Sequence, residues 1–352
     1  MPLQVLSSSL QASAATADNI QHSDIDVKQK PINLNFEQQN LGNVGFKEFI
    51  STLQEHISVN DLTFNINDNH LSDEQFLQIG EKLSRFSQIR NLKLYLKHNN
   101  ITSSGIKQFI EKISSLYALQ ELEIDLTNLH LQNSGIAEIS SSIQLLQSLT
   151  SLTINLENNQ ITEQGAQQLF KSIGCLTNLV HLSIQLAKNT IRSAGMCNLQ
   201  DSWSNLSKLE SLRLDVINNN IGDEGIISLA NAISLFKNLT RVDLYLRYNS
   251  IQNLGGEILA KQISKIENIK TVNLYTGRNK IDEKGARKIS SYLGSSNSLT
   301  NLIIYLNDES IDLLKEDIAH RKSLYMSLQV YSQYVAPHLQ YMPLQSLWDL
   351  YY

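Results

Sequence analysis

Hydrophobic and polar positions recur along this chain with a fixed period of 30 residues. Residues 149–178 (LTSLTINLENNQITEQGAQQLFKSIGCLTN) align without a gap with residues 209–238 (LESLRLDVINNNIGDEGIISLANAISLFKN). Self-similarity at one spacing is typical of repeat architectures, in which each unit buries its hydrophobic face against its neighbours. The pattern therefore predicts a stack of repeated coils rather than one globular core.

Each coil can be numbered from the first apolar residue of its expected strand, which is given offset 0. This residue recurs at Ile32, Leu62, Leu92, Leu122, Leu152, Leu182, Leu212, Val242, Val272 and Leu302. Apolar residues also stand at offsets 2 and 4, as in Ile184 and Leu186, and this alternation is typical of a strand with one buried face. Apolar residues then return at helical spacing, as in Leu169 and Ile173. Each coil is thus predicted to hold one strand followed by one helix.

Asparagine occupies offset 7 in seven of the ten coils. These residues are Asn69, Asn99, Asn159, Asn189, Asn219, Asn249 and Asn279. Backbone groups need partners where the chain turns over a core. An inward amide side chain offers two donors and an acceptor for that purpose. We predict that the asparagines form a structural ladder from coil to coil.

Two further positions mark the transition from strand to helix. Offset 9 is always Ile or Leu, and offset 13 is Gly in eight of the ten coils. We expect the glycine to let the start of the helix pack close to the strand backbone. Ser72, Thr102, Thr162 and Asp282 follow the offset-9 residue and are suitable helix N-caps.

The frame LxxLxL followed by NxIxxxGxxxL resembles the ribonuclease-inhibitor-like class of leucine-rich repeats over about residues 30–320. There is one departure, because LVHLSIQLAKN has four residues between the strand motif and its Asn, whereas that class has two. The two extra residues predict a slightly longer strand. The extended form also resembles repeat arrays of ciliated protists.

The resemblance implies an α/β fold, a leucine-rich-repeat solenoid shaped like a horseshoe. Ten strand–helix coils would place parallel strands on the concave face and helices on the convex face. The same shape follows from size, because strands stack about 4.8 Å apart whereas helices are about 10 Å across. A stack with strands on one side and helices on the other must curve towards its strands.

The repeats divide the chain into three expected parts. Residues 1–31 are polar and form an N-terminal extension with a weak cap, and residues 32–325 hold the ten repeats. The last coil departs from the pattern, with Glu309 at the Asn position and Lys315 at the Gly position, as expected of a terminal repeat. Residues 326–352 are rich in Tyr. They are either a cap on the last coil or a docking tail for a partner.

Charge and composition narrow the function classes. The net charge of −5 argues against a nucleic-acid partner, which would require a basic face. The N-terminus lacks a secretory signal pattern and has its first basic residue at Lys28, and no apolar run is long enough to span a membrane. We expect a cytoplasmic protein, or one built into a cytoskeletal or ciliary structure. Cys175 and Cys197 are expected to be reduced and mostly buried.

The candidate binding residues lie on the exposed strand positions, offsets 1, 3 and 5. Tyrosine occupies offset 3 in the last three coils, at Tyr245, Tyr275 and Tyr305. Charged residues surround this column, namely Arg213, Asp215, Asp243, Arg247 and Arg278. Tyr and Arg dominate interface hot spots, which favours a partner-binding face. Alternatively, Tyr is present because it favours strands, with the rings stacked on each other or covered by the tail.

A second, smaller cluster of candidate residues on the same face comprises Lys93, Tyr95, Lys97 and His98. Catalytic, cofactor-binding and metal-binding motifs are not found in the sequence.

The leading hypothesis is a non-enzymatic scaffold or adaptor that binds a protein partner through its concave face, including as a subunit of a larger assembly. The alternative is a GTPase-activating protein of the Ran type, which shares this repeat class and would need Arg213 or Arg247 at the phosphates of a nucleotide. An inhibitor of a basic enzyme would need a more acidic face. An innate-immune sensor would need an attached signalling domain.

Overall fold

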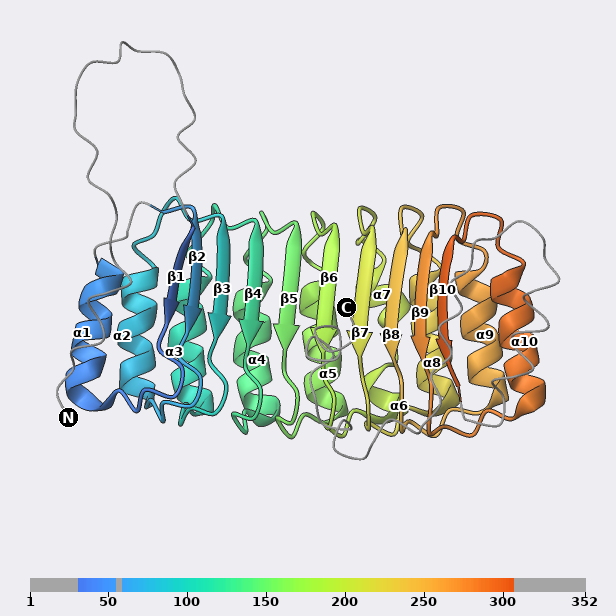
Figure 1. Ribbon diagram of the computed structural model, residues 1–352, viewed down its shortest axis with the longest axis horizontal. Coiled ribbons are helices and arrows are strands. Elements are labelled where there is room, and N and C mark those ends of the chain that lie inside the picture. The colour runs from blue at the N-terminus through green and yellow to red at the C-terminus, as the bar shows by residue number, and fades with distance from the viewer. Residues whose placement is uncertain (1–30, 55–58, 307–352) are drawn as a thin grey trace, which may run out of the picture.

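The computed structural model describes residues 31–54 and 59–306, which form one open sheet of ten parallel strands in chain order (Figure 1). Neighbouring strands pair with a shift of 30 residues, from Ile32 opposite Leu62 at one end to Val272 opposite Leu302 at the other. The repeat period read from the sequence is therefore confirmed through all nine strand pairings.

The strands run from offset −1 to offset 3, except for β1, which begins at offset 0. They are β1 (Ile32–Asn35), β2 (Asp61–Asn65), β3 (Asn91–Tyr95), β4 (Glu121–Asp125), β5 (Ser151–Asn155), β6 (His181–Gln185), β7 (Ser211–Asp215), β8 (Arg241–Tyr245), β9 (Thr271–Tyr275) and β10 (Asn301–Tyr305).

Each strand but the last is followed by one helix along the described chain, except β6, which is followed by two. They are α1 (Gly42–Gln54), α2 (Asp73–Leu83), α3 (Ser103–Ile113), α4 (Gln132–Ile143), α5 (Glu163–Ile173), α6 (Arg192–Gly195), α7 (Leu199–Trp203), α8 (Gly222–Ile233), α9 (Asn253–Ile263) and α10 (Glu283–Gly294). The rest of the tenth coil, from residue 307, and the expected tail at residues 326–352 lie outside the described residues, as does most of the expected extension 1–31.

All helices lie behind one face of the sheet, and the row of helices is longer than the row of strands (Figure 1). At the N-terminal end α1 lies beyond β1, and at the C-terminal end α9 and α10 lie beyond β10 (Figure 1). The strands therefore line the concave face and the helices the convex face, as expected for this solenoid.

The core fills the space between the sheet and the helices. Leu182, Ile184 and Leu186, at offsets 0, 2 and 4 of the sixth coil, are at most 2% exposed. The strand itself ends at offset 3, yet the backbone N–H of Leu186 still donates to Asp215 O (2.7 Å) in the next coil. The two extra residues thus extend the hydrogen bonding between coils beyond the strand rather than lengthening the strand.

The offset-7 asparagines bond to the backbone of the preceding coil. Asn189 Nδ2 donates to Leu156 O (3.1 Å) and to Leu186 O (2.9 Å). Its Oδ1 accepts from the N–H groups of Asn159 (3.0 Å) and Ile161 (2.9 Å). All seven asparagines contact the offset-4 carbonyl and the offset-9 N–H of the coil before them. Every coil in this series is thereby tied to its neighbour at the turn after the strand.

The ladder has a gap at the fourth coil, where Leu129 occupies offset 7. The Leu129 side chain is buried, with 4% of its surface exposed. In the third coil, the N–H of Ile101 has no acceptor among the described residues, although the equivalent N–H of Ile161 bonds to Asn189. The expectation of a continuous row is therefore wrong at this one junction.

The glycines at offset 13 have a different neighbour from the one expected. A Cβ on Gly105 would collide with the side chain of Asp73, at offset 11 of the preceding coil. That carboxylate accepts the N–H of Thr102 (2.7 Å) at the start of α3. In the last coils, Gly285 leaves room for Asn253 in the same way. Gly105, Gly165, Gly255 and Gly285 thus admit a polar side chain of the preceding coil, whereas the other four glycines at offset 13 lie against the offset-9 Ile or Leu of their own coil.

The expected N-caps behave in two ways. Thr102 and Asp282 cap their helices, and Asp282 Oδ1 accepts from Gly285 N (3.0 Å). Ser72 is the N-cap of α2 and forms a capping box with Gln75, whose Oε1 accepts the N–H of Ser72 (2.9 Å). The Thr162 side chain instead accepts a hydrogen bond from Asn133 Nδ2 (2.7 Å).

The sixth coil departs from the repeat because its helix is broken into α6 and α7. Asn198 has the left-handed φ of 62° between them. Trp203 is fully buried against Phe170 and Phe236, and its Nε1 donates to Phe170 O (3.1 Å). The carbonyl of Ser202 then passes so close to Gly174 that a side chain there would overlap it. The break therefore depends on a glycine in the preceding coil.

Both cysteines are exposed on the helical side, Cys175 after α5 and Cys197 between α6 and α7. The expectation that they are mostly buried is wrong, because both positions fall at helix ends that face away from the sheet. Among the described helices, none is long and apolar enough to cross a membrane.

Candidate functional site

The register of the last coils brings the tyrosines at offset 3 into one column. Tyr245 on β8 pairs with Tyr275 on β9, which pairs with Tyr305 on β10. The rings of Tyr245 and Tyr275 stack with centroids 4.7 Å apart and planes 4° from parallel. Because strand spacing is also about 4.8 Å, the two rings stack without bending the backbone.

An arginine from the seventh coil covers the other side of the stack. The Arg213 guanidinium carbon lies 4.9 Å from the centroid of the Tyr245 ring. With Arg213 on one face and Tyr275 on the other, Tyr245 is 8% exposed. Asp243 is 5% exposed. The expectation that offsets 1 and 3 are open to solvent is therefore wrong at these two residues, whereas Tyr275 is half-buried.

Tyr305, Arg247 and Gly277 form the neighbouring part of the same surface. The Arg247 guanidinium carbon lies 5.7 Å from the Tyr305 ring centroid and 5.7 Å from that of Tyr248. A Cβ on Gly277 would lie 2.9 Å from Cε1 of Tyr305. Gly277 was not singled out from the sequence, although it replaces a side chain at offset 5 and leaves room for this ring. We call Arg213, Tyr245, Tyr275, Arg247 and Tyr305 the Tyr–Arg cluster.

The remaining charged residues predicted for this site have separate roles. Arg241 Nε pairs with Asp243 Oδ2 at 2.7 Å, and Asp243 also accepts from Asn273 Nδ2. Asp215 accepts the N–H of Ile217 (2.9 Å) through its Oδ1. Arg278 is exposed at offset 6, beyond the end of β9, with a left-handed φ of 61°. The structure thus gathers the rings with Arg213 and Arg247, and places Arg278 at the rim.

Burial changes the acid–base properties of this surface. It raises the pKa of the Asp215 carboxyl to about 6, against the partial opposing effect of the hydrogen bond from Ile217. Burial likewise raises the pKa of the Tyr275 hydroxyl to about 12 and raises that of Tyr245. The two stacked tyrosines are therefore neutral hydrogen-bonding groups at neutral pH.

A second regular set of bonds on the concave face was missed from the sequence. In five coils an Asn or Asp at offset 3 accepts the N–H of its own offset-5 residue. These acceptors are Asn35, Asn65, Asp125, Asn155 and Asp215. Their recurrence at one offset was a usable signal. Much of the polar surface of the N-terminal coils is therefore structural.

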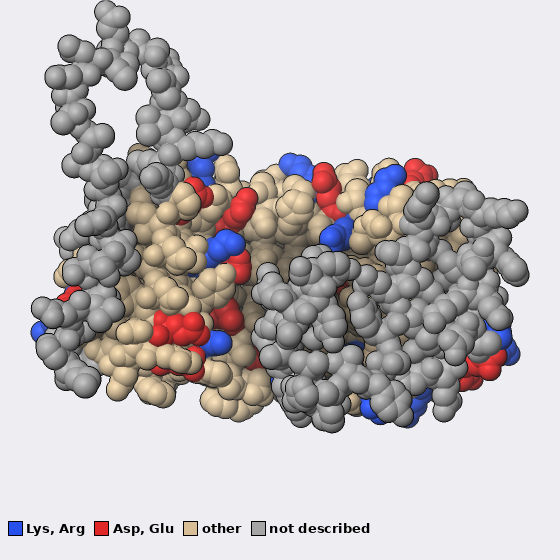
Figure 2. Space-filling view, viewed as in Figure 1, with Lys and Arg blue, Asp and Glu red and all other residues tan. Residues whose placement is uncertain are grey.

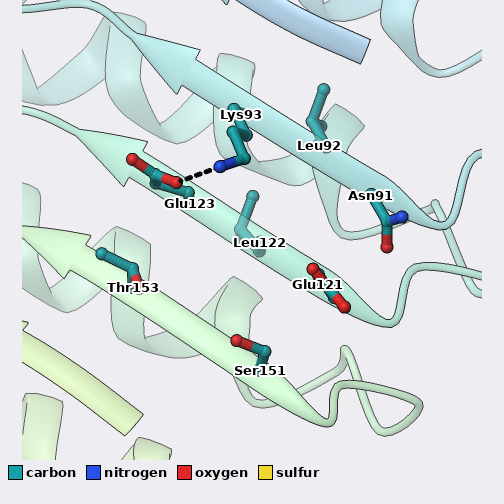
Figure 3. A pocket seen from close by; sticks show the side chains of 8 residues that line it. All are labelled: Asn91, Leu92, Lys93, Glu121, Leu122, Glu123, Ser151 and Thr153. Carbon is teal, nitrogen blue, oxygen red and sulfur yellow. Dashed lines mark ion pairs between the residues drawn. The ribbon is translucent and has the colours of Figure 1, made fainter. Parts of the chain in front are cut away.

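The second candidate cluster, on β3 and just after it, is internally neutralised. Lys93 Nζ lies 3.0 Å from a carboxylate oxygen of Glu123, as Figure 3 shows, and the Tyr95 hydroxyl donates to the same carboxylate (2.7 Å). Lys97 lies 4.0 Å from Glu37. The hollow beside Lys93 has a volume of only about 150 Å³. Acidic and basic side chains are intermixed on this half of the strand face (Figure 2).

The histidine of this cluster belongs to a separate pair, because His98 Nδ1 lies 2.7 Å from Asp68 Oδ1. Within the described ranges, no three His, Cys, Asp or Glu side chains gather in a way that would hold a metal ion.

Comparison with known proteins agrees with the repeat. A leucine-rich-repeat family model matches residues 208–230, which include β7 and the start of α8. The crystal structure of internalin C2 from Listeria monocytogenes is similar over 73% of this chain and 83% of that chain, with 20% sequence identity and a TM-score of 0.42. No curated protein matches the chain in sequence. The ten-stranded parallel sheet and the family match together identify the fold as a leucine-rich-repeat solenoid.

Proposed function

We propose that this protein is a non-enzymatic scaffold that binds a protein partner on its concave face, at the Tyr–Arg cluster. The observation that carries the proposal is the layered arrangement of Arg213, Tyr245 and Tyr275, with Arg247 and Tyr305 beside it. Tyrosine and arginine supply most of the binding energy in many protein interfaces. Stacking also fixes the side chains in advance, which lowers the entropy lost on binding.

The contrast between the two halves of the concave face supports the C-terminal coils as the site. In the N-terminal coils, Lys93 is paired with Glu123 and most offset-3 side chains bond to their own backbone. In the Tyr–Arg cluster, neither Arg213 nor Arg247 has a carboxylate within ion-pair distance among the described residues. Because these two cations form no ion pair within the described residues, they support a partner-binding role for this surface.

The test is affinity capture from a native lysate, with the bound proteins identified by mass spectrometry. The full chain is compared with Tyr245→Ala/Tyr275→Ala/Tyr305→Ala and with the single variant Arg278→Glu, which changes an exposed rim residue. Tyr95→Ala is the matched control, because it removes a tyrosine at the same offset in the third coil. Circular dichroism checks that each variant is folded.

Proteins that are retained by the parent and by Tyr95→Ala but lost from the triple variant would support the proposal. A set of captured proteins that is the same for all variants would overturn it. If the triple variant does not fold, loss of the same proteins from Arg278→Glu would still support this face as the interface, and their retention would count against it.

We further propose the finer assignments that the repeat suggests. The two extra residues between the strand motif and the asparagine support the extended, 30-residue form of the ribonuclease-inhibitor-like class. Two exposed thiols, Cys175 and Cys197, fit a reducing cytoplasmic environment, in which such thiols persist. The cellular role that we propose is that of a permanent subunit of a cytoskeletal or ciliary assembly. Co-sedimentation of the tagged protein with the cytoskeletal fraction of its own cell tests that role.

The alternative function is stimulation of a small GTPase in the manner of Ran GTPase-activating proteins. It is favoured by the same two arginines, because such a protein places a polar side chain at the nucleotide phosphates. Measurement of GTP hydrolysis with and without the chain discriminates the two functions. An increase in hydrolysis that is lost in Arg213→Gln or Arg247→Gln would favour the alternative.

A further inference from the structure

The hydrogen bonds at offset 5 differ between the two halves of the concave face. In six coils a side-chain oxygen on this face accepts the backbone N–H of the offset-5 residue. Five of these acceptors stand at offset 3 of the same coil. In the third coil, where Tyr95 holds offset 3, Asn67 of the preceding coil accepts the N–H of Lys97 (3.0 Å). A side-chain acceptor for the offset-5 N–H is therefore a regular feature of the concave face.

The eighth and ninth coils lack that acceptor. Tyr245 and Tyr275 occupy offset 3, and neither side chain reaches its own offset-5 amide. The N–H groups of Arg247 and Gly277 have no acceptor among the described residues. The N–H of Ala187, in the sixth coil, also has no acceptor among the described residues. It is separated from that of Arg247 by the N–H of Ile217 in the seventh coil, which donates to Asp215. Arg247 and Gly277 therefore form the one adjacent pair of free donors in the described part of this column.

Charged donors lie beside these two amides. Arg213 Nε and Arg247 Nε are both buried without a hydrogen-bond partner in the structure. The position of a Cβ on Gly277 would be 3.7 Å from Arg247 Nε, so this guanidinium borders the second free amide. Arg241, by contrast, is already paired with Asp243. The surface thus offers several donors, two of them cationic, with few acceptors of its own.

The nearby carboxylates do not accept hydrogen bonds from these free donors. Asp243 is held by Arg241 and Asn273, and Asp215 is held by the N–H of Ile217. Buried donors that lack partners are costly, and that cost is removed when a charged acceptor binds. The ligand expected here is therefore an anion with more than one acceptor group.

We infer that the Tyr–Arg cluster binds an acidic segment of a partner protein, whose carboxylates accept from the amides of Arg247 and Gly277 and from the guanidinium groups of Arg213 and Arg247. This inference rests on the proposed function and specifies its partner. The donors extend from the seventh to the ninth coil, or two strand spacings of about 5 Å each, which is wider than a single phosphate group. The edges of the tyrosine rings provide apolar contact for the methylene groups of glutamate side chains.

The charge on the rest of the concave face orients such a segment. Among the concave-face residues of the fourth and fifth coils, Glu121, Glu123, Asp125 and Glu157 are acidic, and no basic residue stands at the same offsets. Glu123 and Glu157 are paired with Lys93 and Lys188, whereas Glu121 and Asp125 have no ion-pair partner among the described residues and disfavour an acidic segment on these coils.

The test uses fluorescence anisotropy with the full chain and a labelled ten-residue peptide of alternating Glu and Ser, compared with its Gln–Ser counterpart. We expect the Glu peptide to bind at least about tenfold more tightly than the Gln peptide, and to weaken as salt is raised. Arg213→Gln/Arg247→Gln should lose most of this binding. Equal binding of the two peptides would overturn the inference.

Two matched variants isolate the free amides. Tyr245→Asn/Tyr275→Asn supplies the internal acceptor that Asn155 provides for Glu157, whereas Tyr245→Ala/Tyr275→Ala removes the rings without supplying one. The Asn pair should bind the Glu peptide several-fold more weakly than the Ala pair, because its amides are already occupied. Equal binding by the two double variants would show that the amides play no part and would overturn this assignment. Melting curves check that both variants fold.

Competition separates this inference from the proposed function. An excess of the Glu peptide should release captured partner proteins, and the same concentration of inorganic phosphate should not. If partners depend on the tyrosines but resist the Glu peptide, the proposed function stands and the acidic ligand is refuted. Release by phosphate as strong as release by the peptide would show binding of a small anion only, and would also refute the acidic segment.

Discussion

The ring of Tyr245 lies flat on the ring of Tyr275, with centroids 4.7 Å apart. The contact is set by the 30-residue register, which places the two residues directly opposite each other on β8 and β9. Because Arg213 and Tyr275 cover the two faces of Tyr245, its ring is largely buried, whereas Tyr275 is half-buried. The repeat geometry therefore shapes the surface that we propose as the binding site.

The gap in the asparagine ladder predicts a stabilising substitution. Leu129→Asn places an amide next to the free N–H of Ile101 and restores the arrangement seen at Asn189. We expect the free energy of unfolding to rise by about 1 kcal/mol, since new buried hydrogen bonds replace an unsatisfied donor. Urea unfolding of the variant and the parent measures the change. A clear loss of stability would mean that packing of the leucine outweighs the missing bonds.

The intact part of the ladder predicts the opposite effect. Asn189→Ala removes the acceptor of the N–H groups of Asn159 and Ile161 and leaves them buried. We expect a loss of about 3–5 kcal/mol, because each buried donor without a partner costs about 1–3 kcal/mol. Asn178→Ala is the control, since the Asn178 side chain makes only exposed bonds, to Gln147 O (2.9 Å) and from Lys208 Nζ (2.7 Å), and its loss should cost less than about 1 kcal/mol. Similar losses for the two variants would contradict the structural role of the ladder.

Two glycines near helix ends predict changes of opposite sign. Gly174→Ala sets a methyl group against the Ser202 carbonyl and should lower the melting temperature strongly, because the α7 backbone must move. Gly294→Ala, at the end of α10, meets open space and should be neutral or raise stability by up to about 1 kcal/mol through helix propensity. Thermal unfolding followed by circular dichroism compares them. A harmless Gly174→Ala would show that α7 does not need the close approach.

The buried carboxyl of Asp215 predicts a pH dependence. Its pKa is raised from 3.8 to about 6 in the folded protein, so the folded state binds the proton more tightly than the unfolded state. Ionisation therefore lowers stability as the pH rises from 4 to 6, and the whole cost is present above pH 6. Asp215→Asn removes that cost and can still accept the N–H of Ile217, as Asn155 does for Glu157.

We expect Asp215→Asn to be more stable than the parent by about 1–2 kcal/mol at pH 7, with the difference shrinking below pH 6 and absent below pH 4. Urea midpoints of the variant and the parent, measured at several pH values, give the difference. A gain that is the same at every pH would show that the pKa of this carboxyl is the same in the folded and the unfolded protein.

The amino-acid sequence by itself determined the repeat, the parallel strands and the position of every strand. The reason is that the same apolar pattern recurs every 30 residues, so that neighbouring strands must pair with a shift of 30 residues. It located the seven asparagines, and the structure gives each of them hydrogen bonds to the preceding coil. It also located the tyrosine column. These features depend on spacing along the chain, which can be read directly.

Only the tertiary structure decided which polar and aromatic side chains are already buried or bonded within the protein. Asp243 and Tyr245 are covered by neighbours from other coils, and the glycine at position 105 faces a side chain from the coil before it. The lack of a side chain at Gly277 leaves room for the ring of Tyr305, 28 positions later. Such contacts join residues about one repeat apart through particular rotamers and hydrogen bonds. The periodicity fixes which residues are neighbours, but the packing of their side chains decides which donors already have an acceptor.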